Sequence, residues 1–318
     1  MRVHIQRKPE TVALEALRAA LADDIEVTFG DEPLPCTVLV CGRPEREWIE
    51  ALPGLQKLVI PFAGLPAATV DVMREFPHVA VHNLHHNAAA TAELAITLLL
   101  AAAKSVVPIN AQLRSGDWSA RGNMGRALQL DGRSALVLGY GAIGRRVART
   151  CTVLGMKVRA VTRREHADSE HELHRPEALA RLLPQADALV VCLPATTETE
   201  GLLGREQLEL LPPSAIVVNV ARGPIIDEAA LFDVLKRRSI FAAGLDVWWN
   251  YPQSEQDWGS TLPSSQPFHE LENVVMSPHR GGHVSDTETQ RMLALAELLN
   301  AVARGEQVPN QVDLAAGY

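Results

Sequence analysis

The chain has 318 residues, of which 47% are hydrophobic and 21% are charged. This composition is ordinary for a globular protein and excludes an intrinsically disordered one, while the length suggests about two domains. The 38 acidic residues outnumber the 30 basic ones, and the net charge of −8 argues against a nucleic acid or an anionic membrane bound by bulk charge. The cysteines, Cys36, Cys41, Cys151 and Cys192, fit neither a disulfide scaffold nor a paired zinc motif.

The N-terminal sequence contains no apolar core of signal-peptide length. The most hydrophobic stretch, residues 88–103, is shorter than the ~20 residues that a membrane span needs, and it contains Glu93. We therefore expect a cytoplasmic protein with reduced thiols and no membrane partner.

The first part of the chain alternates short β-branched runs with helical patterns. Strands are predicted at residues 3–5, 25–29, 37–40, 58–60 and 79–82, with helices around residues 14–21, 45–52 and 67–75. This alternation is typical of parallel βαβ units whose sheet is covered on both faces. A long apolar helix is then predicted from Ala89 to Val107.

A second alternating series begins at Ala135. Strands are predicted at residues 135–138, 158–161, 188–193, 215–220, 242–247 and 274–276. The last long helix, Thr287–Arg304, is expected to return to the first unit. The predicted fold class is therefore α/β with two doubly wound parallel sheets. A flavodoxin-like substrate domain is expected over residues 1–86 and 286–318, and a Rossmann dinucleotide-binding domain over 87–285.

The strongest local motif is a glycine loop that joins a predicted strand to a predicted helix. It reads Gly139-Tyr140-Gly141-Ala142-Ile143-Gly144. Gly139 permits the tight turn, Gly141 lets the backbone approach a pyrophosphate, and Gly144 lets the helix pack on the strand. With Ala142 and Ile143, the first turn of the helix offers N–H donors to the phosphates.

The next strand ends at Thr162-Arg163-Arg164, where the dinucleotide fingerprint expects a carboxylate for the ribose hydroxyls. A carboxylate would repel the 2′-phosphate of NADP, whereas an arginine can pair with it. The sequence therefore favours NADP modestly over NAD. A solvated loop is the alternative interpretation of these arginines.

Four motifs in order resemble the D-isomer-specific 2-hydroxyacid dehydrogenases over nearly the whole chain. They are the glycine loop, VNVARGPIIDEAAL from Val218, AAGLDVW from Ala242 and NVVMSPHRGG from Asn273. The resemblance implies that Arg222 binds the substrate carboxylate and carbonyl, and that His279 exchanges a proton with the substrate oxygen. These residue types suit the chemistry, because a guanidinium matches a carboxylate and an imidazole titrates near neutrality.

The chain departs from the family pattern at Tyr251, which stands where the family usually has a glutamate that hydrogen-bonds the histidine. A phenol cannot stabilise an imidazolium as a carboxylate does. Either the site works without this carboxylate, or Glu255 or Asp257 of the same long loop replaces it. The related formate dehydrogenases also lack this glutamate, and Asn87 resembles their substrate-binding asparagine.

The resemblance extends to further positions. It implies that Pro194, Thr196, Val220 and Asp246 contact the cofactor, and that the loop with Ala63 and Gly64 holds the substrate carboxylate. The clustered histidines and glutamates between residues 165 and 174 match no standard ligand spacing, and we predict no metal site. The apolar helix from Ala89 predicts a homodimer, and the resemblance implies one too, because members of the family are commonly dimers across this region.

The sequence thus predicts an oxidoreductase that transfers a hydride between NADP or NAD and a small D-2-hydroxy acid or 2-keto acid. One alternative is a formate-dehydrogenase-like oxidation that needs no proton relay. The other is a nucleotide-sensing regulatory protein on the same fold. The presence of both Arg222 and His279 favours an enzyme, whereas the missing glutamate favours a sensor more weakly.

Overall fold

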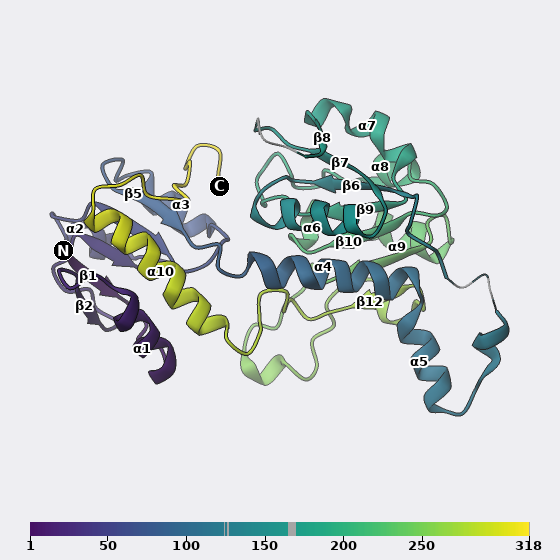
Figure 1. Cartoon of the computed structure of the whole chain (residues 1–318), viewed down its shortest axis with the longest axis horizontal. Helices are drawn as coiled ribbons and strands as arrows, with labels where there is room; N and C mark the ends of the chain where they lie inside the picture. Colours follow the sequence, from purple (N-terminus) through teal and green to yellow (C-terminus); the bar gives the residue numbers. More distant parts are fainter. Residues whose placement is uncertain (124, 126, 165–169, 318) are drawn as a thin grey trace. The chain divides into compact units, whose positions relative to one another are not determined.

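The computed structural model describes residues 1–123, 125, 127–164 and 170–317 (Figure 1). The chain forms two compact units, each built around its own parallel sheet, as the sequence predicts. The first unit comprises Met1–Ala88 and Gly282–Tyr318, and the second comprises Ala89–Gly281.

The first unit is a five-stranded parallel sheet with helices on both faces. The strand order is β2-β1-β3-β4-β5. Its strands are β1 (Arg2–Ile5), β2 (Glu26–Phe29), β3 (Val38–Val40), β4 (Lys57–Ile60) and β5 (Ala80–Asn83). Its helices are α1 (Thr11–Ala20), α2 (Arg46–Glu50), α3 (Ala67–Met73) and α10 (Thr287–Ala303).

Alternate side chains of these strands enter two separate cores. Val3 and Val40 pack with Leu17 of α1 and Leu299 of α10. Leu39, Leu58 and Ile60 face the other way and pack with Ile49 of α2 and Met73 of α3. Both faces are apolar because a parallel sheet is covered on both sides. The C-terminal helix is therefore a structural part of the first unit.

The second unit contains, among its described residues, a seven-stranded parallel sheet in the order β12-β11-β10-β9-β6-β7-β8. Its strands are β6 (Ser134–Leu138), β7 (Lys157–Val161), β8 (Glu172–His174), β9 (Ala188–Val191), β10 (Ile216–Asn219), β11 (Ala242–Leu245) and β12 (Val274–Met276). Its helices are α4 (Ala88–Ala103), α5 (Val106–Arg114), α6 (Ala142–Val153), α7 (Leu179–Leu182), α8 (Arg205–Glu209) and α9 (Glu228–Lys236).

The chain reverses its direction of winding between β6 and β9. After β6 it adds β7 and β8 on one side, and then it adds β9 to β12 on the other. Ligands of open α/β sheets bind at such a switch point, beyond the carboxyl ends of the strands. The glycine loop follows β6 and therefore lies at this point.

The structure corrects the predicted helix Ala89–Val107. α4 ends at Ala103, Ser105 adopts a left-handed conformation with φ of 49°, and α5 starts at Val106. Pro108 explains the break, because its ring would clash with the carbonyl of residue 104 in a continuous helix. Among the described residues, no single helix is long and apolar enough to span a membrane; only α4 and α5 taken together pass on length and composition, and they are bent by 64°.

Candidate active site

The glycine loop has the shape that a dinucleotide pyrophosphate requires. Gly139 has φ of 93°, and a Cβ there would lie 2.7 Å from the Cys192 carbonyl oxygen. A Cβ on Gly144 would lie 1.9 Å from the Gly139 oxygen, so α6 packs directly on the turn. A Cβ on Gly141, the N-cap of α6, would meet no heavy atom within 4 Å. The first turn of α6, with Ala142 and Ile143, thus opens onto free space and fits an anionic phosphate.

The segment after β7 is fixed by its neighbours. The Thr162 N–H donates to the His174 carbonyl at 2.9 Å, and the Arg164 N–H donates to the Thr162 hydroxyl at 3.2 Å. The guanidinium of Arg163 pairs with the carboxylate of Glu198. Arg163, which the sequence predicts to bind the 2′-phosphate of NADP, is therefore already paired with a carboxylate in this structure.

The loop after β9 is held by a residue that sequence reasoning missed. Thr199 is buried, and its hydroxyl accepts the Thr196 N–H at 2.8 Å and donates to the Pro194 carbonyl at 2.7 Å. This three-residue threonine spacing could have signalled a turn closed by a side chain. Pro194 and Thr196 therefore have a defined place beside the glycine loop.

Arg222 lies at the carboxyl end of β10. The amide of fully buried Asn219 accepts the Ala221 N–H at 3.0 Å and donates to the Arg222 carbonyl at 2.9 Å. A Cβ on Gly223 would lie 2.2 Å from the Trp248 carbonyl oxygen, so the turn packs tightly on the segment after β11. The Arg222 side chain is exposed. Val220 is buried, and its N–H donates to the Val191 carbonyl at 3.3 Å.

His279 follows β12 and occupies a strained turn. Its φ of 54° is rare for a residue with a side chain. The buried carboxylate of Asp246 accepts the Ser277 hydroxyl at 2.5 Å and the backbone N–H groups of Arg280 and Gly281, both at 2.9 Å. Trp248 adds a bond from Nε1 to the Ser277 carbonyl at 2.8 Å. Asp246, which the resemblance assigns to the cofactor, here binds the histidine loop.

Tyr251 lies against the imidazole of His279. The two ring centroids are 5.5 Å apart, and the planes are tilted by 58°. The phenol oxygen accepts the Trp248 N–H at 3.1 Å. Burial raises the pKa of Tyr251, and the nearby Asp246 adds to the rise, while the Trp248 N–H and the charge of Arg222 oppose it. The phenol is therefore neutral at physiological pH and lies within the electrostatic reach of Arg222.

The structure does not bring together every predicted residue. Asp257 accepts the Ser254 hydroxyl at 2.8 Å, which commits its carboxylate to its own loop. Glu255 begins the short 3-10 turn η6, Glu255–Asp257. Among the contacts established between described residues, none links either position to His279, so the suggestion that one of them replaces the missing glutamate stays a prediction.

The predicted substrate residues of the first unit lie at the ends of β4 and β5. The Ala63 carbonyl accepts the Asn83 Nδ2 amide at 2.9 Å, which fixes the loop containing Gly64. Asn87 packs against Gly282, where a Cβ would lie 2.6 Å from Asn87 Nδ2.

Two histidines of the first unit are held neutral. Burial lowers the pKa of His82, whose Nδ1 contacts the Pro309 carbonyl at 2.9 Å. Burial, with the charges of Arg291 and His85, lowers the pKa of His86 to about 4. His82 is almost fully buried at 1% exposure, whereas His86 is half-buried.

In the described ranges, no three His, Cys, Asp or Glu side chains gather as a metal site would require. His171 instead contacts the Tyr140 hydroxyl at 2.8 Å and the Thr152 hydroxyl at 3.0 Å. Glu165 and His166, which belong to the same sequence cluster, lie outside the described residues.

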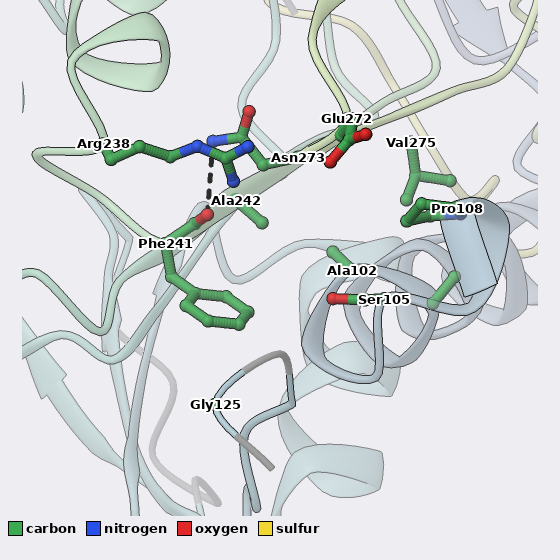
Figure 2. Close-up of a pocket in the computed structure, with 11 residues that line it drawn as sticks. Ala102, Ser105, Pro108, Gly125, Arg238, Phe241, Ala242, Glu272, Asn273 and Val275 are labelled. Carbon is green, nitrogen blue, oxygen red and sulfur yellow. Dashed lines mark hydrogen bonds between the residues drawn. The ribbon is translucent and has the colours of Figure 1, made fainter. Parts of the chain in front are cut away.

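A cavity of about 230 Å³ lies at the amino-terminal ends of the strands, beside the start of β11 and β12 (Figure 2). Arg238 and Asn273 both line this cavity, and the Asn273 amide donates to the Phe241 carbonyl at 3.2 Å (Figure 2). This cavity is separate from the candidate site, because the site residues follow the carboxyl ends of the strands.

Comparisons with known proteins identify the family to which this chain is similar. Residues 96–281 match the family model described as D-isomer specific 2-hydroxyacid dehydrogenase, NAD binding domain. Glyoxylate/hydroxypyruvate reductase B of Pectobacterium atrosepticum is 31% identical over 277 residues, 86% of this chain and 83% of that protein. D-3-phosphoglycerate dehydrogenase of Archaeoglobus fulgidus is 32% identical over 86% of this chain and 50% of that protein.

A solved structure is similar over the full length. The D-isomer specific 2-hydroxyacid dehydrogenase from Xanthobacter autotrophicus Py2, in complex with NADPH and MES, superposes with a TM-score of 0.81. Its sequence is 26% identical, and the match covers 100% of this chain and 99% of that one.

Proposed function

Since the chain belongs to the D-isomer specific 2-hydroxyacid dehydrogenase family and is an NAD(P)-dependent oxidoreductase of hydroxy acids, we propose that it reduces a small 2-keto acid to the D-2-hydroxy acid. The position of Tyr251 is the observation that carries this proposal. Its ring contacts His279, and its phenol lies within the electrostatic reach of Arg222. A carboxylate-binding cation and a proton donor therefore belong to one site.

In the proposed mechanism, Arg222 binds the substrate carboxylate with its planar guanidinium and polarises the adjacent carbonyl. The glycine loop would hold the dinucleotide, whose nicotinamide would supply the hydride for the carbonyl carbon. His279 gives its proton to the carbonyl oxygen, so that a keto acid, a hydride and a proton yield the hydroxy acid. Asp246 and Trp248 hold the loop that carries His279.

We propose NADP as the preferred cofactor and NAD as the alternative cofactor of the same site. The segment Thr162-Arg163-Arg164 supports this preference. It has two arginines at the position where NAD-binding proteins have a ribose-binding carboxylate, and such a carboxylate would repel the 2′-phosphate of NADP. The similar Xanthobacter autotrophicus structure contains NADPH.

We propose that the protein is a cytoplasmic homodimer. Helix α5 buries none of its residues, and it exposes Val106, Val107 and Leu113 by about half of each surface. Trp118, in the same part of the second unit, is 67% exposed. Such an apolar surface marks an interaction site, and a second copy with two-fold symmetry is the simplest partner. The four free cysteines suit a reducing compartment.

One second function has a specific observation in its favour. Tyr251 gives His279 no carboxylate, and oxidation of formate would need no proton relay. Turnover with glyoxylate, hydroxypyruvate, other small 2-keto acids and formate, each with both cofactors, decides between the two reactions. Binding of nucleotide without any turnover would instead support the regulatory alternative.

Arg222→Lys tests the assignment of the substrate anchor. Lysine keeps the charge but loses the bidentate geometry, and we expect the catalytic efficiency to fall by about 2–4 kcal/mol of transition-state stabilisation. The nucleotide dissociation constant should change little. Arg238→Lys, on the opposite edge of the sheet, is the matched control. Wild-type efficiency in Arg222→Lys would refute the assignment.

A further inference from the structure

An ion pair crosses the carboxyl end of β6. Arg163 follows β7, and Glu198 lies in the loop after β9. β6 lies between these two strands in the sheet, and its carboxyl end carries the glycine loop. Because the Arg163 guanidinium contacts the Glu198 carboxylate, the pair spans the carboxyl end of β6, where the proposed dinucleotide site lies.

Both ends of this pair are positioned by other contacts. Next to Glu198, Thr199 is buried and bonded within its loop, and the Glu200 N–H donates to the Thr196 carbonyl at 3.0 Å. On the other side, a guanidinium nitrogen of Arg175 donates to the Arg163 carbonyl oxygen. The carboxylate and the guanidinium are therefore brought together by two fixed backbones.

The pair is nevertheless easy to open. The side chain of Arg163 is 37% exposed and that of Glu198 is 69% exposed. Exposed ion pairs contribute only about 0–1 kcal/mol because water and salt screen them. A phosphate monoester carries nearly two negative charges and offers several acceptor oxygens, so it binds a guanidinium more strongly than a carboxylate does.

We propose that Glu198 sets the cofactor preference by competing with the 2′-phosphate of NADP for Arg163. With NAD the pair stays closed, because the ribose hydroxyls bring no charge. With NADP the phosphate must displace the carboxylate, so Glu198 lowers the affinity for NADP and leaves that for NAD unchanged. This inference rests on the proposed place of Arg163 at the adenosine ribose.

Glu198→Gln tests the competition directly, because it removes the charge and keeps the size of the side chain. The dissociation constants of NADPH, NADH and 2′,5′-ADP are measured by fluorescence titration and calorimetry, without substrate. We expect NADPH and 2′,5′-ADP to bind about two- to five-fold more tightly at low ionic strength, with NADH unchanged. The gain should shrink as salt screens the charges.

Two further variants make the outcome decisive. Glu200→Gln removes the same charge two residues away on the same loop, and it should leave all three affinities unchanged. Arg163→Ala should weaken NADPH binding, and adding Glu198→Gln to it should give no further gain. A gain of equal size in the Arg163→Ala background, or in Glu200→Gln, would overturn the competition, as would no gain in Glu198→Gln alone.

The same titrations keep this inference apart from the proposed function. If the wild-type protein binds NADH more tightly than NADPH, the proposed preference fails, and the effect of Glu198 on NADPH is still measured. If no 2-keto acid is reduced, the proposed reaction fails, and the nucleotide affinities still report on Arg163 and Glu198.

Discussion

Asp246→Asn should disable the site by releasing the loop that carries His279. The carboxylate accepts three hydrogen bonds from Ser277, Arg280 and Gly281. An amide keeps one acceptor oxygen, which can serve Ser277 and Arg280 together. Its nitrogen then faces the Gly281 N–H, so two donors meet in a buried place.

The magnitude follows from these bonds. Loss of one charge-assisted bond costs about 1.5–3 kcal/mol, and an unsatisfied buried donor costs about 1–3 kcal/mol. Removal of a buried charge returns part of this cost. We therefore expect the free energy of unfolding to fall by about 2–3 kcal/mol. Because the left-handed turn at His279 is strained and persists only while its surroundings hold it, the turn should relax.

Catalysis should suffer more than stability. A displacement of the proton donor by about 1 Å can cost about 10²-fold in rate, and we expect a loss of at least that size in kcat/KM for the best keto acid. Ser277→Ala removes one of the three donors and should cost about 1.5–3 kcal/mol in stability, because this bond also goes to the carboxylate. Urea unfolding, steady-state kinetics and NADPH titration are measured on the same samples.

Two results would contradict this reasoning. Wild-type kcat/KM in Asp246→Asn would mean that the carboxylate does not hold His279 in place. A loss of NADPH affinity as large as the loss of activity would mean that Asp246 acts on the cofactor, as the resemblance implies, and not through the histidine loop.

Three further predictions concern the glycine loop, the half-buried His86 and the phenol of Tyr251. Gly141→Ala should keep wild-type stability, because its Cβ meets nothing within 4 Å, and should weaken NADPH binding measured by titration, while Gly144→Ala should lower the free energy of unfolding, because its Cβ would overlap the Gly139 oxygen. Folded His86 stays neutral down to a pKa of about 4, whereas the unfolded chain takes up this proton near 6.5. Stability should therefore fall by up to about 3 kcal/mol as the pH drops through this window, and His86→Gln should flatten the fall in urea unfolding. Tyr251→Glu should extend keto-acid reduction to higher pH in rate profiles, because a carboxylate stabilises the imidazolium; an unchanged profile would remove the phenol from the proton relay.

The main outline of both sheets could be predicted from sequence, because buried parallel strands are continuous apolar runs such as Ala188–Val191. Strand β8 could not, since Glu172–His174 is short and polar. This strand forms because it pairs with Arg159, Ala160 and Val161 of β7. Arg159 Nε also contacts the Glu172 carboxylate at 3.3 Å. Pairing with an existing edge is tertiary information that a local pattern does not contain.

The candidate site divides in the same way. The glycine loop, Arg222 and His279 could be found because motifs specify residue types at fixed spacings. The hydrogen bonds from Asp246 and Trp248 that hold the histidine loop, here called the clamp, could not be found, because they depend on the register of β11 and β12. β11 and β12 align Leu245 with Met276, and this alignment sets Asp246 beside Ser277.

The clamp also explains how the site tolerates Tyr251. In the family that the sequence resembles, one glutamate both holds the histidine and supplies a charge. Here Asp246 and Trp248 hold the loop through its backbone, and Tyr251 packs on the imidazole without any charge. Orientation and electrostatic support are thus separate in this protein. The hydrogen bonds to the loop fix its backbone, and the charge of Arg222 reaches the phenol that packs on the imidazole. A cation close to the imidazole would disfavour its protonated form. A proton donor placed in this way works best when the solution itself supplies the proton, so we expect the reduction to be fastest on the acidic side of neutrality.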